Sequence, residues 1–226
     1  MSGIELAKSY DLFQPEKCEG AIHIIGCGSI GSTVAEELAR YGITNIRLYD
    51  FDTVEPHNLN NQSFRQQHIG ILKTEALASM LYEINPEIEK HIKLYPEGYT
   101  DQNLSGYVFL CVDSIELRRQ IVTDNRYNKF IKAMFDFRTR LTDAQHWAAD
   151  WNDYKMVEAF LKSMSHSDEE ARAETPVSAC NTTLCARSTV TSISAFGVFN
   201  FVNFVNTGQI KKAKFVDLLQ SRLDAF

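Results

Sequence analysis

The sequence predicts an α/β protein with a Rossmann-like, doubly wound, mostly parallel sheet, helices on both faces and a C-terminal elaboration. Short apolar runs alternate with amphipathic segments over residues 21–136, which is the pattern of consecutive βαβ units. A glycine-rich turn separates the first apolar run from the first amphipathic segment. The 226 residues are 44% hydrophobic and 23% charged, an ordinary globular composition. We therefore expect one domain over residues 1–226.

The periodicity gives an order of elements. The expected strands are 21–25, 45–50, 91–95, 107–112 and 131–136, and the expected helices are 30–41, 71–85 and 115–125. After residue 137 the pattern weakens, and we expect one or two strands in 138–150, a helix at 153–164 and a helix or exposed loop at 165–175. The last twenty residues are the one candidate tail.

The most apolar segment is 188–206. Asn200, Asn203 and Asn206 recur there at every third residue, so on a helix they lie near one another. This spacing favours a core helix with a polar edge over a membrane anchor. We expect no membrane association.

Composition excludes several classes of protein. A formal charge of −6 argues against nucleic acid as a partner. The first twenty residues lack the apolar stretch of a signal peptide, so a cytoplasmic location is expected. Five cysteines without a CxxC pair fit neither a disulfide framework nor a four-cysteine zinc site, and we predict free thiols and no zinc.

The turn after the first strand has the spacing of a phosphate-binding loop. It reads Gly26-Cys27-Gly28-Ser29-Ile30-Gly31, a G-x-G-x-x-G motif between a predicted strand and a predicted helix. The first glycine allows a tight turn, the second lets backbone approach a phosphate, and the third lets helix and strand pack closely. Backbone N–H groups at the helix start then face an anion. The alternative is a glycine-rich turn without a ligand.

A carboxylate follows the second strand. Asp50 lies nineteen residues after Gly31, where it can accept hydrogen bonds from ribose hydroxyls, and Asp52 competes for that role. The loop and the carboxylate suit ATP and a nicotinamide or flavin dinucleotide equally well. An NAD(P)- or FAD-dependent oxidoreductase therefore stays open at this point.

The next segments carry a family resemblance. Residues 50–62 contain an aspartate-rich strand end followed by Val54-Glu55-Pro56-His57-Asn58-Leu59-Asn60-Asn61-Gln62, and Gly70-Ile71-Leu72-Lys73 opens the next helix. Cys111-Val112-Asp113-Ser114 ends a later strand, with Arg118 shortly after. This pattern resembles ThiF/MoeB-type adenylyltransferases and ubiquitin-activating enzymes. The resemblance covers roughly residues 18–136, the nucleotide-binding part, and returns around 176–206 within a substrate and crossover part, 137–226.

The resemblance implies an ATP- and Mg²⁺-dependent adenylyltransferase. Such an enzyme activates a carboxylate as an acyl-adenylate and releases pyrophosphate, and its substrate is the C-terminus of a small ubiquitin-like or sulfur-carrier protein, or a peptide. A homodimer is also implied. The chemistry brings one anion onto another, so cations have to be in place before reaction.

By the same resemblance, Asp50 holds ribose and Asn58 and Lys73 hold phosphates, while Asp113 binds Mg²⁺. Lys73, Asp113 and Arg118 are then the catalytic group. The nucleotide site further includes these residues: Asp52, Asn61, Gln62, Arg65 and Val112. Taken singly, Lys73 reads equally well as a solvated helix residue, Asp113 as a helix N-cap, and Arg118 as a surface charge or the partner of Glu116.

The chain departs from the family pattern in two places. Asn61 stands where the motif has an arginine, and Arg65, one helical turn later, is the hypothesised replacement. No arginine precedes Arg40, although family members commonly add one from the N-terminal segment of a partner protomer; Lys8 or Lys17 is the available substitute. A non-catalytic nucleotide-binding adaptor therefore stays open.

A cysteine precedes the long apolar helix. Cys180 lies in a segment that resembles the place where some family members carry a cysteine that takes up the activated carboxylate or its sulfur. A thiolate near a helix N-terminus has a lowered pKa, which favours such chemistry. The alternative is a small buried thiol. Cys185 is a weaker candidate, and residues 138–175, which match no part of the pattern, are the candidate substrate-specific surface.

Overall fold

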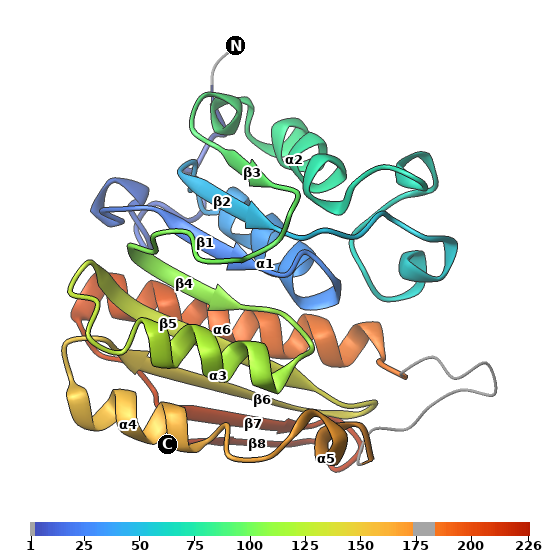
Figure 1. Ribbon diagram of the computed structural model, residues 1–226. Coiled ribbons are helices and arrows are strands. Elements are labelled where there is room, and N and C mark those ends of the chain that lie inside the picture. Colours follow the sequence, from blue (N-terminus) through green and yellow to red (C-terminus); the bar gives the residue numbers. More distant parts are fainter. Residues whose placement is uncertain (1–2, 174–183) are drawn as a thin grey trace.

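The computed structural model describes residues 3–173 and 184–226, which form one eight-stranded sheet with helices on both faces (Figure 1). The strand order is β3-β2-β1-β4-β5-β6-β7-β8. The pairs from β3 to β5 are parallel, and those from β5 to β8 are antiparallel. The predicted fold class is confirmed.

The elements up to residue 136 lie within a few residues of their expected bounds. The strands are β1 (Ile22–Ile25), β2 (Ile46–Tyr49), β3 (Lys93–Tyr95), β4 (Gly106–Leu110), β5 (Ile131–Thr139), β6 (Asp143–Asp150), β7 (Ala213–Asp217) and β8 (Arg222–Ala225). The α-helices are α1 (Ser29–Arg40), α2 (Lys73–Ile84), α3 (Ile115–Asp124), α4 (Tyr154–Lys162), α5 (Asp168–Ala173) and α6 (Arg187–Thr207). Short 3₁₀ turns occupy η1 (Pro15–Lys17), η2 (Pro56–Asn60), η3 (Gln66–His68) and η4 (Pro86–Lys90).

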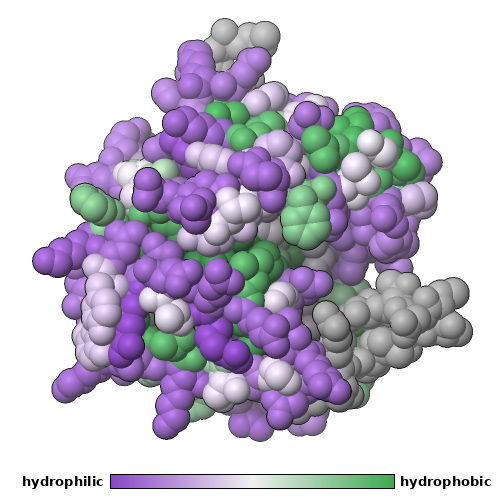
Figure 2. Space-filling model, viewed as in Figure 1, coloured by the Kyte–Doolittle hydropathy of each residue, from purple (hydrophilic) through white to green (hydrophobic). Residues whose placement is uncertain are grey.

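Two apolar layers sandwich the sheet. Because successive strand side chains point to opposite faces, Ile24 and Phe109 pack with α1, α2 and α6, whereas Ile25 and Leu110 pack with α3 and α4. All five residues of β4 are buried, as expected of a central strand covered on both faces. Figure 2 shows that the outer surface over α3 and α4 is mostly hydrophilic, with apolar residues in scattered patches.

Helix α6 packs across the sheet beside α1. By length and composition alone it would suffice to cross a membrane, but half of its apolar window is buried inside the fold. Its asparagines tie it to three segments: Asn200 Nδ2 donates to the Lys211 carbonyl (2.8 Å), Asn203 to that of Gln209 (2.7 Å) and Asn206 to that of Leu12 (2.7 Å). The expected core helix with a polar edge is confirmed.

The C-terminal segment corrects the expectation of a tail. Residues 213–217 and 222–225 form β7 and β8; β7 pairs antiparallel with β6, and β8 pairs antiparallel with β7. These strands are short, and the side chains of β8 are largely exposed, so their sequence carries little periodic signal. Backbone pairing of β7 with β6, and of β8 with β7, forms these strands although their sequences show little periodicity. Within residues 138–150, where one or two strands were expected, β5 ends at Thr139 and β6 begins at Asp143.

Candidate functional site

The strand ends that carry the glycine loop, Asp50 and Asp113 lie where the order of the sheet reverses. Strands β1 and β4 are neighbours, and their connections leave to opposite sides, which creates the position where open parallel sheets bind ligands, beyond the carboxyl ends of the strands. The register pairs Ile25 of β1 with Tyr49 of β2 and Leu110 of β4. Gly26 and Asp50 therefore start at the same level of the sheet, and Asp113 follows three residues beyond Leu110.

The three glycines of the loop have different surroundings. A Cβ on Gly26, whose φ is +93°, would lie 2.7 Å from the Cys111 carbonyl oxygen, and a Cβ on Gly31 would lie 1.8 Å from the Gly26 carbonyl oxygen. A Cβ on Gly28 would meet nothing within 4 Å. Packing thus requires the outer glycines, whereas the middle one borders open space.

The start of α1 is free to receive an anion. Its N-cap, Gly28, makes no side-chain capping bond, and the first turn contains no acidic residue. The first N–H groups of a helix have no partner inside the helix and carry the positive end of its dipole. The N–H groups of Ser29 and Ile30 lie at this helix start, where the motif predicts a phosphate.

Asp50, the first of two carboxylates beyond β2, is held by two backbone N–H groups. Asp50 accepts hydrogen bonds from the Cys27 N–H (2.6 Å) and the Asp52 N–H (2.9 Å). Burial raises the pKa of Asp50, and the charge of Lys73 opposes that rise. Each carboxylate oxygen has a second lone pair, so Asp50 retains acceptor capacity for a ribose hydroxyl.

Lys73 begins α2 and lies beside Asp52, which follows the carboxyl end of β2. Its Nζ is 2.7 Å from Oδ2 of Asp52, and its side chain is 9% exposed while that of Asp52 is 52% exposed. Its own N–H also donates to the Asp52 carbonyl, which fixes the start of α2 beside the strand end. Lys73 is therefore a partly buried charge and not a solvated helix residue.

Side-chain amides of Asn58 and Asn61 form hydrogen bonds that hold the connection from β2 to α2. Asn58 is buried, and its Oδ1 accepts from the Glu55 N–H (2.9 Å) within η2. Asn61 Nδ2 donates to the Cys185 carbonyl (3.4 Å), across to the segment before α6. Among the residues that the structure describes, Gln62 Oε1 is buried without a hydrogen-bond partner. The predicted amides thus border the site, with one acceptor unsatisfied.

Arg65 does not replace an arginine at position 61. Its side chain is exposed and pairs with Glu83 at 2.8 Å. Glu83 lies ten residues after Lys73 on α2, about 15 Å along a helix that rises 1.5 Å per residue. The structure therefore corrects this hypothesis, since Arg65 is directed toward the far end of α2.

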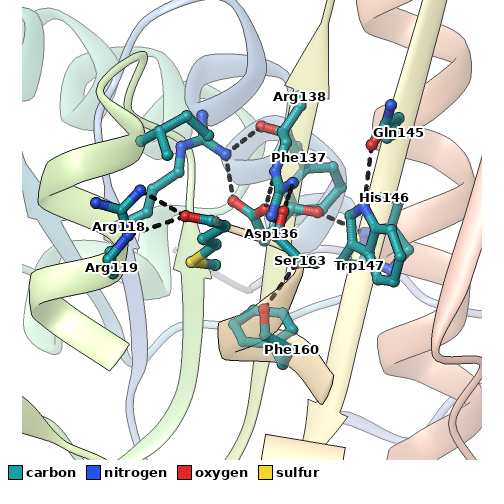
Figure 3. Close-up of polar contacts among 12 residues, drawn as sticks. Arg118, Arg119, Asp136, Phe137, Arg138, Gln145, His146, Trp147, Phe160 and Ser163 are labelled. Atoms are coloured by element: carbon teal, nitrogen blue, oxygen red, sulfur yellow. Dashed lines mark hydrogen bonds and ion pairs between the residues drawn. The ribbon is translucent and has the colours of Figure 1, made fainter. Parts of the chain in front are cut away.

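Arg118 is also committed elsewhere. It is 4% exposed, and its guanidinium donates to the Asp136 carboxylate and to the carbonyls of Phe137 and Val112 (Figure 3). Arg138 Nε binds the second oxygen of Asp136 at 2.7 Å. Burial alone raises the pKa of Asp136, but the two guanidinium groups outweigh it and hold the pKa below its usual value. Arg118 is neither a surface charge nor the partner of Glu116, and within residues 3–173 and 184–226 its guanidinium donates to Val112, Asp136 and Phe137 and not to the glycine loop.

Asp113 is exposed just beyond β4. It is not the N-cap of α3, because Ser114 Oγ accepts the Leu117 N–H and Asp168 accepts the Ile115 N–H. Within residues 3–173 and 184–226 no group of three or more His, Cys, Asp or Glu side chains is arranged to hold a metal. A single carboxylate is nevertheless sufficient where phosphates and water complete the shell of Mg²⁺.

Comparison with known proteins identifies the family. The sequence matches the ThiF family over residues 14–216, nearly the whole chain. The protein belongs to the ThiF family.

Two curated relatives are named ubiquitin-like modifier-activating enzyme 5. The one from Arabidopsis thaliana is 46% identical over 70 residues, which are 31% of this chain and 16% of the relative. The one from Dictyostelium discoideum is 34% identical over 117 residues, 45% of this chain and 31% of the relative. The chain spans less than a third of the length of these relatives.

Solved structures share the fold of this ThiF-family chain. Escherichia coli MccB with ATP superposes with a TM-score of 0.70 at 17% identity, covering 94% of this chain and 65% of MccB. PaaA gives the same TM-score and coverage at 16% identity. At these identities the likeness establishes the ThiF-type fold.

The thiols described in this ThiF-family chain are not activated. Burial raises the pKa of Cys27 and of Cys111 and, less strongly, of Cys185, whose Sγ lies 3.5 Å from Thr139 Oγ1. Cys180 lies outside the described residues, so its predicted covalent role stays a prediction.

Sequence reasoning missed one cation. Arg187, the first residue of α6, donates from Nη1 to Thr33 Oγ1 (2.8 Å) and the Asn61 carbonyl (3.2 Å), and from Nη2 to Ser63 Oγ (3.2 Å). It joins α1, the β2–α2 connection and α6. A signal was present, because Arg187 is the one charged residue between Glu174 and Lys211.

Proposed function

We propose that this ThiF-family chain is an ATP- and Mg²⁺-dependent adenylyltransferase that activates a carboxylate as an acyl-adenylate and releases pyrophosphate. One observation carries the proposal: the open turn at Gly28 and the uncapped start of α1 lie at the same sheet edge as Lys73 and Asp113. The names of the relatives and the binding of ATP by MccB support it.

Each residue has a defined task in this reaction. The N–H groups at Ser29 and Ile30 bind phosphate oxygens, and Asp50 accepts from the ribose. Lys73 exchanges part of its contact with the exposed Asp52 carboxylate for the phosphates, where it stabilises the negative charge that builds up during attack. Asp113 supplies an oxygen ligand for Mg²⁺, which neutralises phosphate charge when bound.

The proposed substrate is the C-terminal carboxylate of a small ubiquitin-like or sulfur-carrier protein, or of a peptide. Support comes from relatives named as ubiquitin-like modifier-activating enzymes and from the solved structure of MccB with AMPCPP and MccA. We further propose a homodimer in the cytoplasm.

Isotope exchange between pyrophosphate and ATP tests the proposal. Ubiquitin-like proteins, sulfur-carrier proteins and peptides are offered one at a time, each with a matched form whose C-terminus is amidated. We expect Mg²⁺-dependent exchange with one free carboxylate, none with its amide, and a large loss in the Asp113→Asn variant. Silence across the panel would contradict the activity.

The two alternatives give different results in the same preparation. An adaptor binds MgATP in calorimetry but exchanges no pyrophosphate. Asn61, which stands where the family motif has an arginine, is the residue that supports an adaptor. A dinucleotide oxidoreductase binds NAD(H) or FAD more tightly than ATP and without dependence on Mg²⁺.

A further inference from the structure

We propose that Arg187 is a phosphate-binding residue of the nucleotide site, supplied by α6 against the backbone of Asn61. The inference rests on the proposed ATP-dependent function, and it names a cation that the resemblance did not assign. Four observations carry it: the neutral partners of Arg187, the positive ends of two helices beside it, its tie to Ser29, and the position of Asn61.

The contacts of Arg187 leave its charge without compensation. The half-buried guanidinium binds two hydroxyl oxygens and one carbonyl oxygen, all neutral. Within residues 3–173 and 184–226 no carboxylate forms an ion pair with it. A guanidinium remains charged at all relevant pH values and has five N–H donors, so two donors stay available beyond the three bonds seen.

The surroundings add positive potential. Arg187 lies in the first turn of α6 and contacts the N-terminal half of α1 through Thr33. Neither helix has a side-chain N-cap or an acidic residue in its first turn. Helix N-termini favour anions and disfavour cations. An arginine held here by neutral oxygens is therefore suited to bind an external anion.

The network connects this charge to the glycine loop. Thr33 Oγ1 accepts from Arg187 and donates to the Ser29 carbonyl (2.8 Å). Ser32 Oγ accepts the Ser63 N–H (3.1 Å), which joins the β2–α2 connection to the same turn of α1. In Figure 1 the start of α6 lies at the side of the sheet to which the carboxyl ends of the parallel strands point. One hydroxyl thus separates the guanidinium from the first residue of α1.

Asn61 explains why the cation comes from α6. Its side chain reaches only as far as the Cys185 carbonyl, two residues before Arg187, while Arg187 returns a hydrogen bond to the Asn61 carbonyl. The role expected of Arg65 passes to a residue distant in sequence.

Calorimetry with two ligands separates phosphate binding from a structural role. Wild-type protein and the variants Arg187→Gln and Arg40→Gln are titrated with MgATP and with adenosine. Glutamine keeps hydrogen-bonding capacity and loses the charge. Arg40 is the matched control, since it lies at the opposite end of α1, is exposed and pairs with Glu36. We expect Arg187→Gln to weaken MgATP by about tenfold to a hundredfold, the effect of a charge-assisted hydrogen bond, with adenosine unchanged.

The outcomes are distinct. MgATP affinity unchanged in Arg187→Gln, or an equal loss for MgATP and adenosine, overturns the inference. A wild-type protein that binds no MgATP contradicts the proposed function instead. A second measurement needs no variant: mass spectrometry follows modification of Arg187 by phenylglyoxal in the wild-type protein. We expect protection by MgATP and none by adenosine, and equal modification in both counts against the inference.

Discussion

Two cation–carboxylate pairs near the carboxyl ends of the strands differ in what surrounds them. Lys73 is paired with Asp52, whose carboxylate is 52% exposed, whereas Arg118 is paired with Asp136, which is fully buried and shared with Arg138. In the first pair, the exposure of Asp52 allows a stronger anion to compete for Lys73. The second is held on both sides by protein. The difference teaches that a charge serves a substrate only if its resident partner can be displaced.

The pairs also differ in what their loss costs. Breaking a buried pair leaves an uncompensated charge in a poorly polarisable interior, whereas an exposed pair is largely replaced by water. We therefore assign Arg118 and Asp136 to stability, because they fix the ends of β4 and β5. Lys73 we assign to the reaction.

The largest expected effect is on folding. Asp136→Asn leaves Arg118 and Arg138 without their carboxylate and should lower the free energy of unfolding by about 3–5 kcal/mol, measured by urea denaturation at pH 7. The matched change Asp52→Asn should cost less, because the Asp52 carboxylate is half exposed and water can take its place beside Lys73. Equal losses in the two variants would end the distinction.

The next effect is on activity. Lys73→Gln should slow pyrophosphate exchange by about a hundred- to a thousandfold, as expected for removal of one electrostatic group at developing charge, with little change in the urea midpoint. Lys90→Gln, which removes an exposed lysine paired with Glu87, serves as control. Normal exchange in Lys73→Gln would assign both pairs to structure.

Lowering the pH should change the contributions of Asp136 and Asp50 to the free energy of unfolding in opposite directions. The pKa of Asp136 is held below its unfolded value, so its stabilisation is present above about pH 4 and is lost as the pH falls through the folded pKa. Burial raises the pKa of Asp50, so protonation on acidification favours the folded state there.

Urea unfolding from pH 7 to pH 3 checks this opposition. We expect Asp136→Asn to flatten the acid dependence of stability and Asp50→Asn to steepen it. Slopes that change in the same direction would contradict the assignment.

The smallest effect is expected at Arg65. Because Arg65 and Glu83 are both exposed, Arg65→Ala should cost less than about 1 kcal/mol of stability. Its affinity for MgATP in calorimetry should stay within about twofold of wild type. A tenfold loss of affinity would return Arg65 to the nucleotide site and weaken the case for Arg187.

The sequence located the part of the site that depends on local geometry. A strand followed by closely spaced glycines and a helix places Gly26, Gly28 and Gly31 without further information, and the ends of parallel strands bring Asp50 and Asp113 to one edge. Boundaries of α1 and α3 followed from their apolar periodicity in the same way. These features need only a few consecutive residues and the direction of the chain.

The partners of the charged side chains could not be predicted from the sequence, because they lie far apart along the chain. Arg118 meets Asp136 across 18 residues, Arg65 meets Glu83 across 18, and Arg187 meets Thr33 across 154. No short pattern records such distances. For the same reason β7 and β8 were missed, since pairing of β7 with β6 and of β8 with β7 forms them more than their own sequence does.

By itself the sequence determined the fold class, the glycine-rich turn between β1 and α1 and the edge of the sheet where the polar residues gather, because these follow from periodicity and from chain direction. Only the tertiary structure decided which cations remain available to a nucleotide. The carboxylate that pairs with Lys73 is half exposed and the partners of Arg187 are neutral, whereas Arg118 is enclosed with the buried Asp136 and Arg65 is directed toward Glu83 near the end of α2. The physical reason is that charge compensation depends on neighbours in space, and the packing of α6 against α1 brings those neighbours together.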